Sequence, residues 1–313
     1  MKKTMSSRTG SILARLACAV AFVGSVAYAA PMQESAPIGD GGGTLATLSF
    51  AIVGDCRPPN EDDVAGYPTK IITRIWQDIE ASSPRPAFAI TPGNYMFANP
   101  DANPGTQDAQ LDDYLAARAN FHNIVFPAMG NDECTGAADS NCGAGGADGD
   151  TANYNAFVTK MLKPIRKTLP YYAIPIKATN DSWTAKFVFI ASNAWSTAQA
   201  RWLNGELAKP TTYTFIVMNA GTSDTTAPCW SATGSNNVGT IIGKYPYTLL
   251  IVGHDHTFAY YSSEKEVVVG NGGAPLSGTV DYGYVIARQQ GTSIVFTEYD
   301  YETNIAQTSF TVQ

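Results

Sequence analysis

The 313-residue sequence predicts an α/β fold. Short apolar runs of strand length alternate with amphipathic stretches of helix length, which is typical of this class. Five of the apolar runs end in short polar turns that contain Gly, Asn, Asp or His. A composition of 44% hydrophobic and 15% charged residues supplies a large core and excludes disordered, collagen-like and coiled-coil chains.

The first part of the domain predicts three strands and two helices. The first helix has Pro68 at its start and repeats apolar residues at helical spacing through Ile72, Trp76 and Ile79. The second helix leads directly into a strand. The expected strands span 48–53, 87–91 and 124–129, and the expected helices span 68–79 and 107–122.

The middle of the chain continues the alternation. Apolar residues recur at helical spacing over 154–165, and we expect Pro164 and Pro170 to kink and end that helix. Ser196 and Gln199 form a capping-box pattern in front of the next helix. The expected strands of this part span 186–191, 213–218 and 248–252.

From His256 to the end, the pattern predicts strands alone. We expect these strands to form a second sheet that packs on the first. They span 257–261, 266–269, 282–288, 293–299 and 308–312.

The N-terminus predicts a signal peptide over residues 1–29. Basic residues precede an apolar run over 16–27, and Ala27-Tyr28-Ala29 provides small residues for cleavage. A transmembrane anchor is the alternative, but it needs about 20 apolar residues. We expect a flexible linker over 30–46, a folded domain over 47–313 and no membrane span in the mature chain, which would be secreted or periplasmic.

The charge balance limits the classes of partner. The chain has 20 Lys and Arg against 27 Asp and Glu, and its first 29 residues contain four bases and no acid. Removing those four bases leaves 16 against 27, a formal charge of −11. Because such a chain repels phosphate backbones and anionic lipid, we expect no nucleic acid partner, but a small molecule or a protein.

Four cysteines remain beyond the signal peptide. An even number in an oxidising compartment predicts disulfides, with three possible pairings. Cys134 and Cys142 close a short polar loop, so we predict that they form a disulfide. A bond between Cys56 and Cys229 would follow by elimination. The spacing matches no zinc-finger pattern.

The polar turns at the strand ends are the candidate functional site. Ligands of open α/β sheets bind beyond the carboxyl ends of the strands, so we expect all five turns to meet at one crevice. A glycine next to the polar residue allows a sharp turn. The turns are Gly54-Asp55-Cys56-Arg57, Gly93-Asn94-Tyr95, Gly130-Asn131-Asp132-Glu133, Asn219-Ala220-Gly221 and Gly253-His254-Asp255-His256.

Two of the three histidines, His254 and His256, lie two residues apart. In an extended segment both imidazoles point the same way, and together with Asp55 they form a plausible set of transition-metal ligands. The alternative is a solvated loop with incidental histidines. We expect His122, at the end of its helix, to be a surface or capping residue.

The order and spacing of these motifs resemble the calcineurin-like metallophosphoesterases. The resemblance implies a four-layer αββα sandwich of two mixed sheets, with two divalent metal ions bound at the five strand-end motifs. It covers nearly all of 47–313 and extends to four further segments, Leu169-Pro-Tyr-Tyr172, Gln199-Ala-Arg-Trp-Leu203, Gly270-Asn-Gly-Gly273 and Tyr282-Gly-Tyr284.

The matching site residues are Asp55, Asn131, His254 and His256, which the resemblance implies as metal ligands. Other positions depart from the family pattern. Arg57 replaces a His ligand, Asn94 replaces the Asp that bridges the metals, and Asn219 replaces another His ligand. Asp132 stands where the family has the His that contacts the phosphate or protonates the leaving group. Phe97 stands where the purple acid phosphatase branch has a Tyr ligand.

These departures remove anionic charge that two divalent cations need. Our main hypothesis is therefore a degenerate, non-catalytic site that binds a small anionic ligand, a single metal ion or a protein partner. Arg57 would serve as a clamp for phosphate or carboxylate, or would form a salt bridge with Asp55 or Asp132.

A second hypothesis is a metal-dependent phosphoester hydrolase with a reduced site. One ion (iron, manganese or zinc) would bind to four of the residues, while Asn94 and Asn219 orient it and Arg57 binds the phosphoryl oxygens. Arg57 and Asp132 would be the catalytic residues, and Asp132 could also be recruited as a ligand. The four ligands would be Asp55, Asn131, His254 and His256. A conventional two-metal phosphatase with unusual ligands ranks third.

Overall fold

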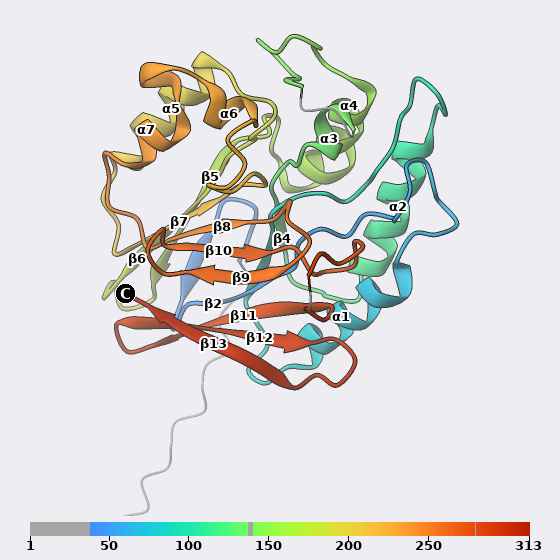
Figure 1. Cartoon of the computed structure of the whole chain (residues 1–313). Coiled ribbons are helices and arrows are strands. Elements are labelled where there is room, and N and C mark those ends of the chain that lie inside the picture. The colour runs from blue at the N-terminus through green and yellow to red at the C-terminus, as the bar shows by residue number, and fades with distance from the viewer. Residues whose placement is uncertain (1–37, 137–139, 279) are drawn as a thin grey trace, which may run out of the picture. The chain divides into compact units, whose positions relative to one another are not determined.

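The structure is a computed structural model that describes residues 38–136, 140–278 and 280–313. The expected signal peptide and the first part of the expected linker, residues 30–37, lie outside the described residues. Two mixed β-sheets form the centre of the domain (Figure 1). The six-stranded sheet has the order β13-β12-β11-β2-β3-β4, and the seven-stranded sheet has the order β1-β5-β6-β7-β8-β10-β9.

The six-stranded sheet joins the two ends of the domain. Strands β2, β3 and β4 are parallel, and β11 pairs with β2 in the antiparallel sense to continue into β12 and β13. The bounds are Ser49–Ile52 for β2, Phe88–Thr91 for β3, Val125–Pro127 for β4, Gly283–Gln290 for β11, Ser293–Asp300 for β12 and Ala306–Val312 for β13.

The seven-stranded sheet contains the middle of the chain. Strands β6, β7, β8 and β10 are parallel, while β5 and β9 pair with them in the antiparallel sense. The bounds are Gly43–Leu45 for β1, Tyr172–Ala178 for β5, Thr184–Phe189 for β6, Tyr213–Val217 for β7, Leu249–Val252 for β8, Phe258–Tyr261 for β9 and Glu266–Val269 for β10.

Helices cover the outer faces of both sheets. The longer ones are α1 (Thr69–Ala81), α2 (Thr106–Arg118) and α5 (Thr197–Leu207). The shorter ones are α3 (Asp132–Thr135), α4 (Ala152–Phe157), α6 (Pro228–Ser231) and α7 (Val238–Ile242). In the described ranges, no helix has the length and apolar character needed to cross a membrane.

Two apolar clusters define the layers. Aromatic rings from both sheets meet between them, with Phe50 of β2 in edge contact with Phe187 of β6 and Phe215 of β7. This inner cluster extends to α1 and α2, whereas a second cluster packs α5 and α7 on the other face of the seven-stranded sheet (Figure 1). The predicted α/β fold with two packed mixed sheets between helical layers is therefore confirmed.

The prediction that the last five strands form their own sheet is wrong. Strand β10 pairs in parallel with β8, so β9 and β10 extend the seven-stranded sheet. Strands β11 to β13 instead join β2. The reason is that the chain crosses from one sheet to the other after Val269, and each sheet combines segments that are distant in the sequence.

The ordered domain begins before residue 47. Part of the segment expected to be a linker forms β1, which pairs with Ile176–Ala178 of β5. Leu45 is fully buried, and Ile38 is 4% exposed. The sequence did not predict β1, because a strand of three residues in a glycine-rich segment is too short to show alternating apolar and polar residues.

The helix expected over 154–165 ends as its prolines predict. After α4, the chain forms a π-helical turn over Val158–Leu162 and a 3₁₀ turn over Lys163–Ile165 that contains Pro164. Ser196 caps α5 by accepting the backbone N–H of Gln199. His122 lies beyond α2, is exposed and pairs with Glu80 at 2.8 Å, as expected for a surface residue.

Glu298 of β12 gives the fold a specific pH dependence. Its side chain is buried, accepts a hydrogen bond from Asn271 at 3.3 Å, and burial raises its pKa from 4.5 to about 7. Because the folded chain holds this proton more tightly than the unfolded chain, ionisation between pH about 4.5 and about 7 disfavours the folded state. We expect the stability of the wild type relative to Glu298→Gln to fall by about 1–3 kcal/mol over this range.

Urea denaturation of both proteins across this pH range measures the effect, and Glu302→Gln, an exposed glutamate after the same strand, is the control. A stability difference that stays constant with pH would contradict the assignment.

Candidate functional site

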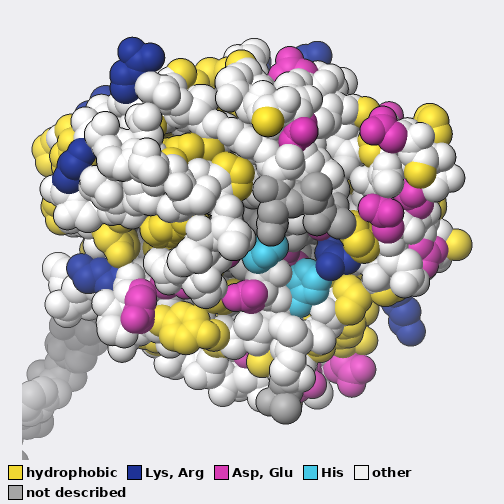
Figure 2. All heavy atoms as spheres, turned by 45° about the horizontal axis from the view of Figure 1, so that its top comes forward, with side chains coloured by type: hydrophobic (Ala, Val, Ile, Leu, Met, Phe, Trp, Pro, Cys, Tyr) yellow, Lys and Arg dark blue, Asp and Glu magenta, His cyan; other side chains and the backbone are white. Residues whose placement is uncertain are grey.

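The five polar turns meet at the ends of β2, β3, β4, β7 and β8, as predicted. Hydrogen bonds link the turns directly: the Cys56 N–H donates to Asn94 O at 2.8 Å, the His254 N–H donates to Asp55 at 2.9 Å, and the Asn131 N–H donates to Asn219 Oδ1 at 3.4 Å. Figure 2 shows histidine side chains in cyan next to a dark blue cationic side chain near the centre of one face.

Three of the site residues have a left-handed backbone. The φ angles are 53° at Asp55, 58° at Asn94 and 68° at His254, each directly after a glycine. Non-glycine residues in this region cost about 1–3 kcal/mol each and are concentrated at functional sites. The sequence predicted sharp turns at the glycines. In the structure, the polar residue after each glycine has the positive φ angle, and Gly93 has one as well.

Gly54 and Gly253 are needed for space. A Cβ atom on Gly54 would lie 2.0 Å from Val269 O, and a Cβ atom on Gly253 would lie 2.6 Å from Asp55 Oδ2. Both contacts are far below van der Waals distance, so no larger residue fits without displacing the site.

Glu133 organises two of the turns, a role that sequence reasoning missed. Its buried carboxylate accepts backbone N–H groups from Asn94 at 2.9 Å, Tyr95 at 2.7 Å, Gly130 at 2.8 Å and Met96 at 3.3 Å. Burial raises its pKa to about 7 although these four donors oppose the shift. The signal in the sequence was a second acid directly after Asp132, but only the fold shows which donors it contacts.

Asp55 is fully buried between the two sheets. Its Oδ2 accepts the His254 N–H, whereas its Oδ1 has no hydrogen-bond partner among the described residues. Burial, and next the negative charge of Asp132, raise the pKa of Asp55 well above its usual value. An unpaired buried carboxylate oxygen is costly, so this atom favours a bound cation, a donor or a proton.

Asn94 and Asn219 each direct one buried, unpaired amide atom into the same region. These atoms are Asn94 Oδ1 and Asn219 Nδ2. A Cβ atom on Gly93 would lie 2.9 Å from Asn219 Nδ2, and one on Gly130 would lie 2.0 Å from Asn94 Oδ1. The two amides are thus held tightly against neighbouring turns, and they present one acceptor and one donor.

Arg57 forms an ion pair with Asp132, one of the alternatives that the sequence left open. The Arg57 Nε to Asp132 Oδ2 distance is 3.2 Å, and the guanidinium lies over the Phe97 ring at 4.3 Å. The Arg57 side chain is 19% exposed and that of Asp132 is 3% exposed. Burial raises the pKa of Asp132, and the charge of Arg57 opposes this shift.

His254 and Asn131 are hydrogen-bonded to each other. His254 Nδ1 lies 3.1 Å from Asn131 Oδ1, and Asn131 Nδ2 donates to Asp132 Oδ1 at 3.2 Å. This contact links His254 through Asn131 and Asp132 to Arg57. The ring nitrogen and the amide oxygen that face each other are therefore both engaged within the protein.

His256 is oriented by a backbone group. Its Nδ1 lies 2.8 Å from Pro275 O, so Nδ1 carries the proton and Nε2 has a lone pair with no hydrogen-bond partner among the described residues. Burial, and next the positive charge of Arg57, lower the pKa of His256 to about 4. The ring is accordingly neutral at neutral pH.

A two-metal centre does not fit these residues. In the parts of the chain that the structure describes, no three His, Cys, Asp or Glu side chains group closely enough to hold a metal ion. Asn131 Oδ1 and His254 Nδ1 are hydrogen-bonded to each other, so neither atom is available to a metal ion. Asn219 presents an N–H group, and Arg57 adds a positive charge. Two divalent cations need bridging and terminal anions, and only Asp55 supplies one at these positions.

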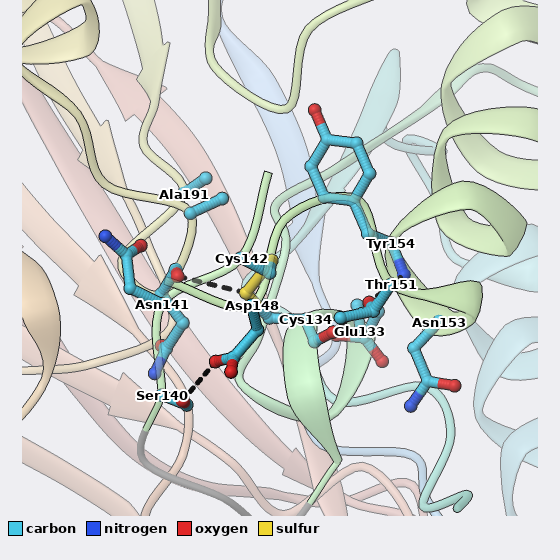
Figure 3. Close-up of a disulfide and its surroundings, with 12 residues drawn as sticks. Glu133, Cys134, Ser140, Asn141, Cys142, Asp148, Thr151, Asn153, Tyr154 and Ala191 are labelled. Atoms are coloured by element: carbon cyan, nitrogen blue, oxygen red, sulfur yellow. Dashed lines mark hydrogen bonds between the residues drawn. A yellow bond between two sulfur atoms is a disulfide. The ribbon is translucent and has the colours of Figure 1, made fainter. Parts of the chain in front are cut away.

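The disulfide between Cys134 and Cys142 is confirmed (Figure 3). It attaches α3, which carries Asp132 and Glu133, to a loop whose Cys142 N–H donates to Asn193 O at 3.0 Å. Asn193 follows β6, so the disulfide connects a turn of one sheet with the end of the other.

The second disulfide expected by elimination is wrong, because Cys56 and Cys229 are free and buried. Cys56 belongs to the cluster between the sheets, and its thiol lies 3.7 Å from Gly272 O. Cys229 of α6 belongs to the cluster on the outer face of the seven-stranded sheet. The seven-stranded sheet separates the two thiols. Counting cysteines in the sequence does not show this separation.

Comparison with solved structures defines the fold as that of the calcineurin-like metallophosphoesterases. GAP50, the anchor in the inner membrane complex of Plasmodium, has a TM-score of 0.58 and 15% identity over 86% of this chain and 89% of its own. A dimetal phosphatase from Danio rerio has a TM-score of 0.58 and 12% identity over 85% of this chain and 98% of its own.

A purple acid phosphatase from yellow lupin (Lupinus luteus) seeds has a TM-score of 0.56 and 16% identity over 88% of this chain and 55% of its own. No family model matches the sequence. No curated protein matches it either. At these identities, the likeness establishes the fold, including the four-layer arrangement that the sequence motifs implied.

Glu133→Gln tests whether this carboxylate holds the two turns. Glutamine has one acceptor oxygen, and its NH₂ group would face backbone donors, so several buried N–H groups would lose their partner. We expect a loss of about 1–3 kcal/mol in the free energy of unfolding. Urea denaturation measures it, with exposed Glu61→Gln as the control, and equal stabilities of the two variants would refute the role.

Proposed function

We propose that this chain is a secreted or periplasmic protein of metallophosphoesterase fold that binds a small oxyanion at the strand-end site without hydrolysing it. The ion pair of Arg57 with Asp132 is the observation that carries this proposal. Arg57 is a fixed cation at a position where the resemblance implies a metal ligand. Its guanidinium pairs with the carboxylate of Asp132, which stands in place of the family's histidine.

Arg57 is well suited to bind an anion. Asp132 and the ring of Phe97 fix the guanidinium, so little side-chain entropy is lost when a ligand binds. Its Nε faces Asp132 and its Nη1 donates to Pro58 O at 3.1 Å, which leaves N–H groups for a ligand. A planar guanidinium with free N–H groups matches phosphate and carboxylate.

The neighbouring residues support binding without turnover. The histidine expected to contact or protonate the substrate is Asp132 here, and its carboxylate is occupied by Arg57. The bridging carboxylate is the neutral amide of Asn94. Loss of a single group that acts in the transition state costs about 10²-fold or more, and several such groups are absent together.

The fold alone is compatible with both binding and catalysis. One similar structure is a dimetal phosphatase, and another is an anchor protein. We therefore derive the proposal from this chain's own side chains, in particular from the charge that Arg57 brings to the site.

A second candidate function is hydrolysis of a phosphoester with one metal ion. The unpaired oxygens Asp55 Oδ1 and Asn94 Oδ1 favour it, and so does the free Nε2 of His256. A carbonyl that orients Nδ1 of a histidine is typical of histidine ligands. These three residues would hold the ion, which would supply Lewis acidity, while Arg57 would bind the phosphoryl oxygens.

Calorimetric titration of the purified chain with inorganic phosphate at low ionic strength tests the proposal. We expect binding that weakens about tenfold or more in Arg57→Gln, because the variant loses a charge-assisted contact. Arg85→Gln is the matched control, since it removes an arginine from an exposed ion pair with Glu80. Equal affinities of the two variants for phosphate would contradict the proposal.

Elemental analysis after exposure to manganese, iron and zinc separates the two candidate functions. We expect no stoichiometric metal and no hydrolysis of an aryl phosphate by the wild type, because Arg57 is a fixed cation that pairs with Asp132. Glu133 is engaged by backbone N–H groups, which leaves Asp55 Oδ1 as the carboxylate oxygen for a metal ion. One metal per chain, together with hydrolysis that disappears in the Asp55→Ala, His256→Ala double variant, would establish the second candidate instead.

The combined variant Asn94→Asp, Asp132→His, Asn219→His is the positive control for that measurement. It restores the family's ligand types on the same backbone, so it should bind more metal than the wild type. A soluble, folded variant that gains none would show that the motifs are wrongly aligned.

A further inference from the structure

A groove on the outer side of the seven-stranded sheet has no role in the strand-end site. It has a volume of about 670 Å³ and lies between the loop over 166–171, the start of β5 and the helix α5. Its lining includes three cations, Arg166, Lys167 and Lys209, against one acid, Glu206. In a chain with a formal charge of −7, a groove with this balance is unusual.

The cations of the groove are available to a ligand. Lys209 pairs with Glu206, and Arg166 pairs with Asp40 at 3.0 Å, but the Lys209 and Arg166 side chains are 68% and 85% exposed. Exposed ion pairs of this kind contribute about 0–1 kcal/mol, so a stronger anion can replace the partner. The Lys167 Nζ lies 5.5 Å from the centre of the Tyr172 ring, and within 38–136, 140–278 and 280–313 it forms no ion pair.

The loop that carries two of these cations is held in place. Arg166 ends the 3₁₀ turn with a left-handed backbone, at φ 55°, and the Lys167 N–H donates to Leu162 O at 3.0 Å. These bonds close the end of the helix, so Arg166 and Lys167 are presented from a fixed turn. Preorganisation of this kind reduces the entropic cost of binding.

The groove also offers apolar contacts. Leu169 is 47% exposed and is one of four large hydrophobic residues exposed in the described ranges. Tyr171 and Trp202 lie in contact at 5.0 Å, tilted by 50°. The two rings contact each other and line the groove together with Leu169, so they provide an apolar surface that favours an apolar side chain.

We infer that this groove binds an acidic peptide segment of a partner protein, with carboxylates on Lys167, Lys209 and Arg166 and an apolar side chain between Leu169 and the tilted aromatic pair. The charge complementarity and the apolar contact together define the partner's chemistry. The surface is separate from Arg57 and the strand-end turns, so the inference is independent of the anion proposed there.

Fluorescence anisotropy of the purified chain with a labelled peptide of Asp and Glu around a central Leu and Phe provides the test. We expect binding that falls about tenfold in the double variant Lys167→Glu, Lys209→Glu and measurably in Leu169→Ser. The matched control is Lys70→Glu, Lys244→Glu, which changes the net charge equally at exposed lysines elsewhere and should bind like the wild type.

Three further outcomes decide the inference. A peptide with Asn and Gln in place of the acids should not bind, and equal binding would overturn the charge argument. Arg57→Gln should keep its affinity for the acidic peptide, and a loss would place the peptide at the strand-end site. Binding of polygalacturonate through the same lysines, without binding of the peptide, would replace the peptide by an anionic saccharide. Circular dichroism confirms that every variant is folded.

Discussion

The buried carboxylate of Glu133 is the interaction on which the shape of the site depends. It accepts four backbone N–H groups from the turns after β3 and β4, and so fixes Asn94 in a left-handed conformation, which Asn adopts more readily than most other residues. The Cys134–Cys142 disulfide also anchors α3, the helix that carries Glu133. Because Asn94 O accepts the Cys56 N–H, the position of the Asp55 turn follows from that of Glu133.

The site keeps the shape of a metal centre with a different distribution of charge. Asn94 and Asn219 are neutral and polar at positions where the resemblance implies an Asp and a His, and the Arg57–Asp132 pair contributes no net charge when both are ionised. Asn131 Oδ1 and His254 Nδ1 lie 3.1 Å apart, so the two side chains hold each other in place. With a fixed guanidinium and few carboxylates at the ligand positions, these residues do not fit two divalent cations.

The sequence predicted the strand ends well and the sheets poorly, for physical reasons. Each strand-end turn has a local signal, a glycine beside a polar residue after an apolar run, and parallel strands place such turns at one edge. Strand pairing has no local signal: β10 is buried on both faces, and its sequence does not indicate that it pairs with β8. The partners of Glu133 and the separation of Cys56 from Cys229 likewise depend on contacts between distant segments.

The hydrogen bond from the His254 N–H to Asp55 joins the two sheets at the strand-end site. Asp55 follows β2 of the six-stranded sheet and His254 follows β8 of the seven-stranded sheet, so this bond closes the seam between the sheets at its functional end. In a metal centre, ions would connect the two sides. Here Asp55 connects them with one oxygen and keeps the other unpaired inside the site. Asp55 therefore has two roles: its Oδ2 joins the two sheets, and its Oδ1 is available to a cation or hydrogen-bond donor of a ligand.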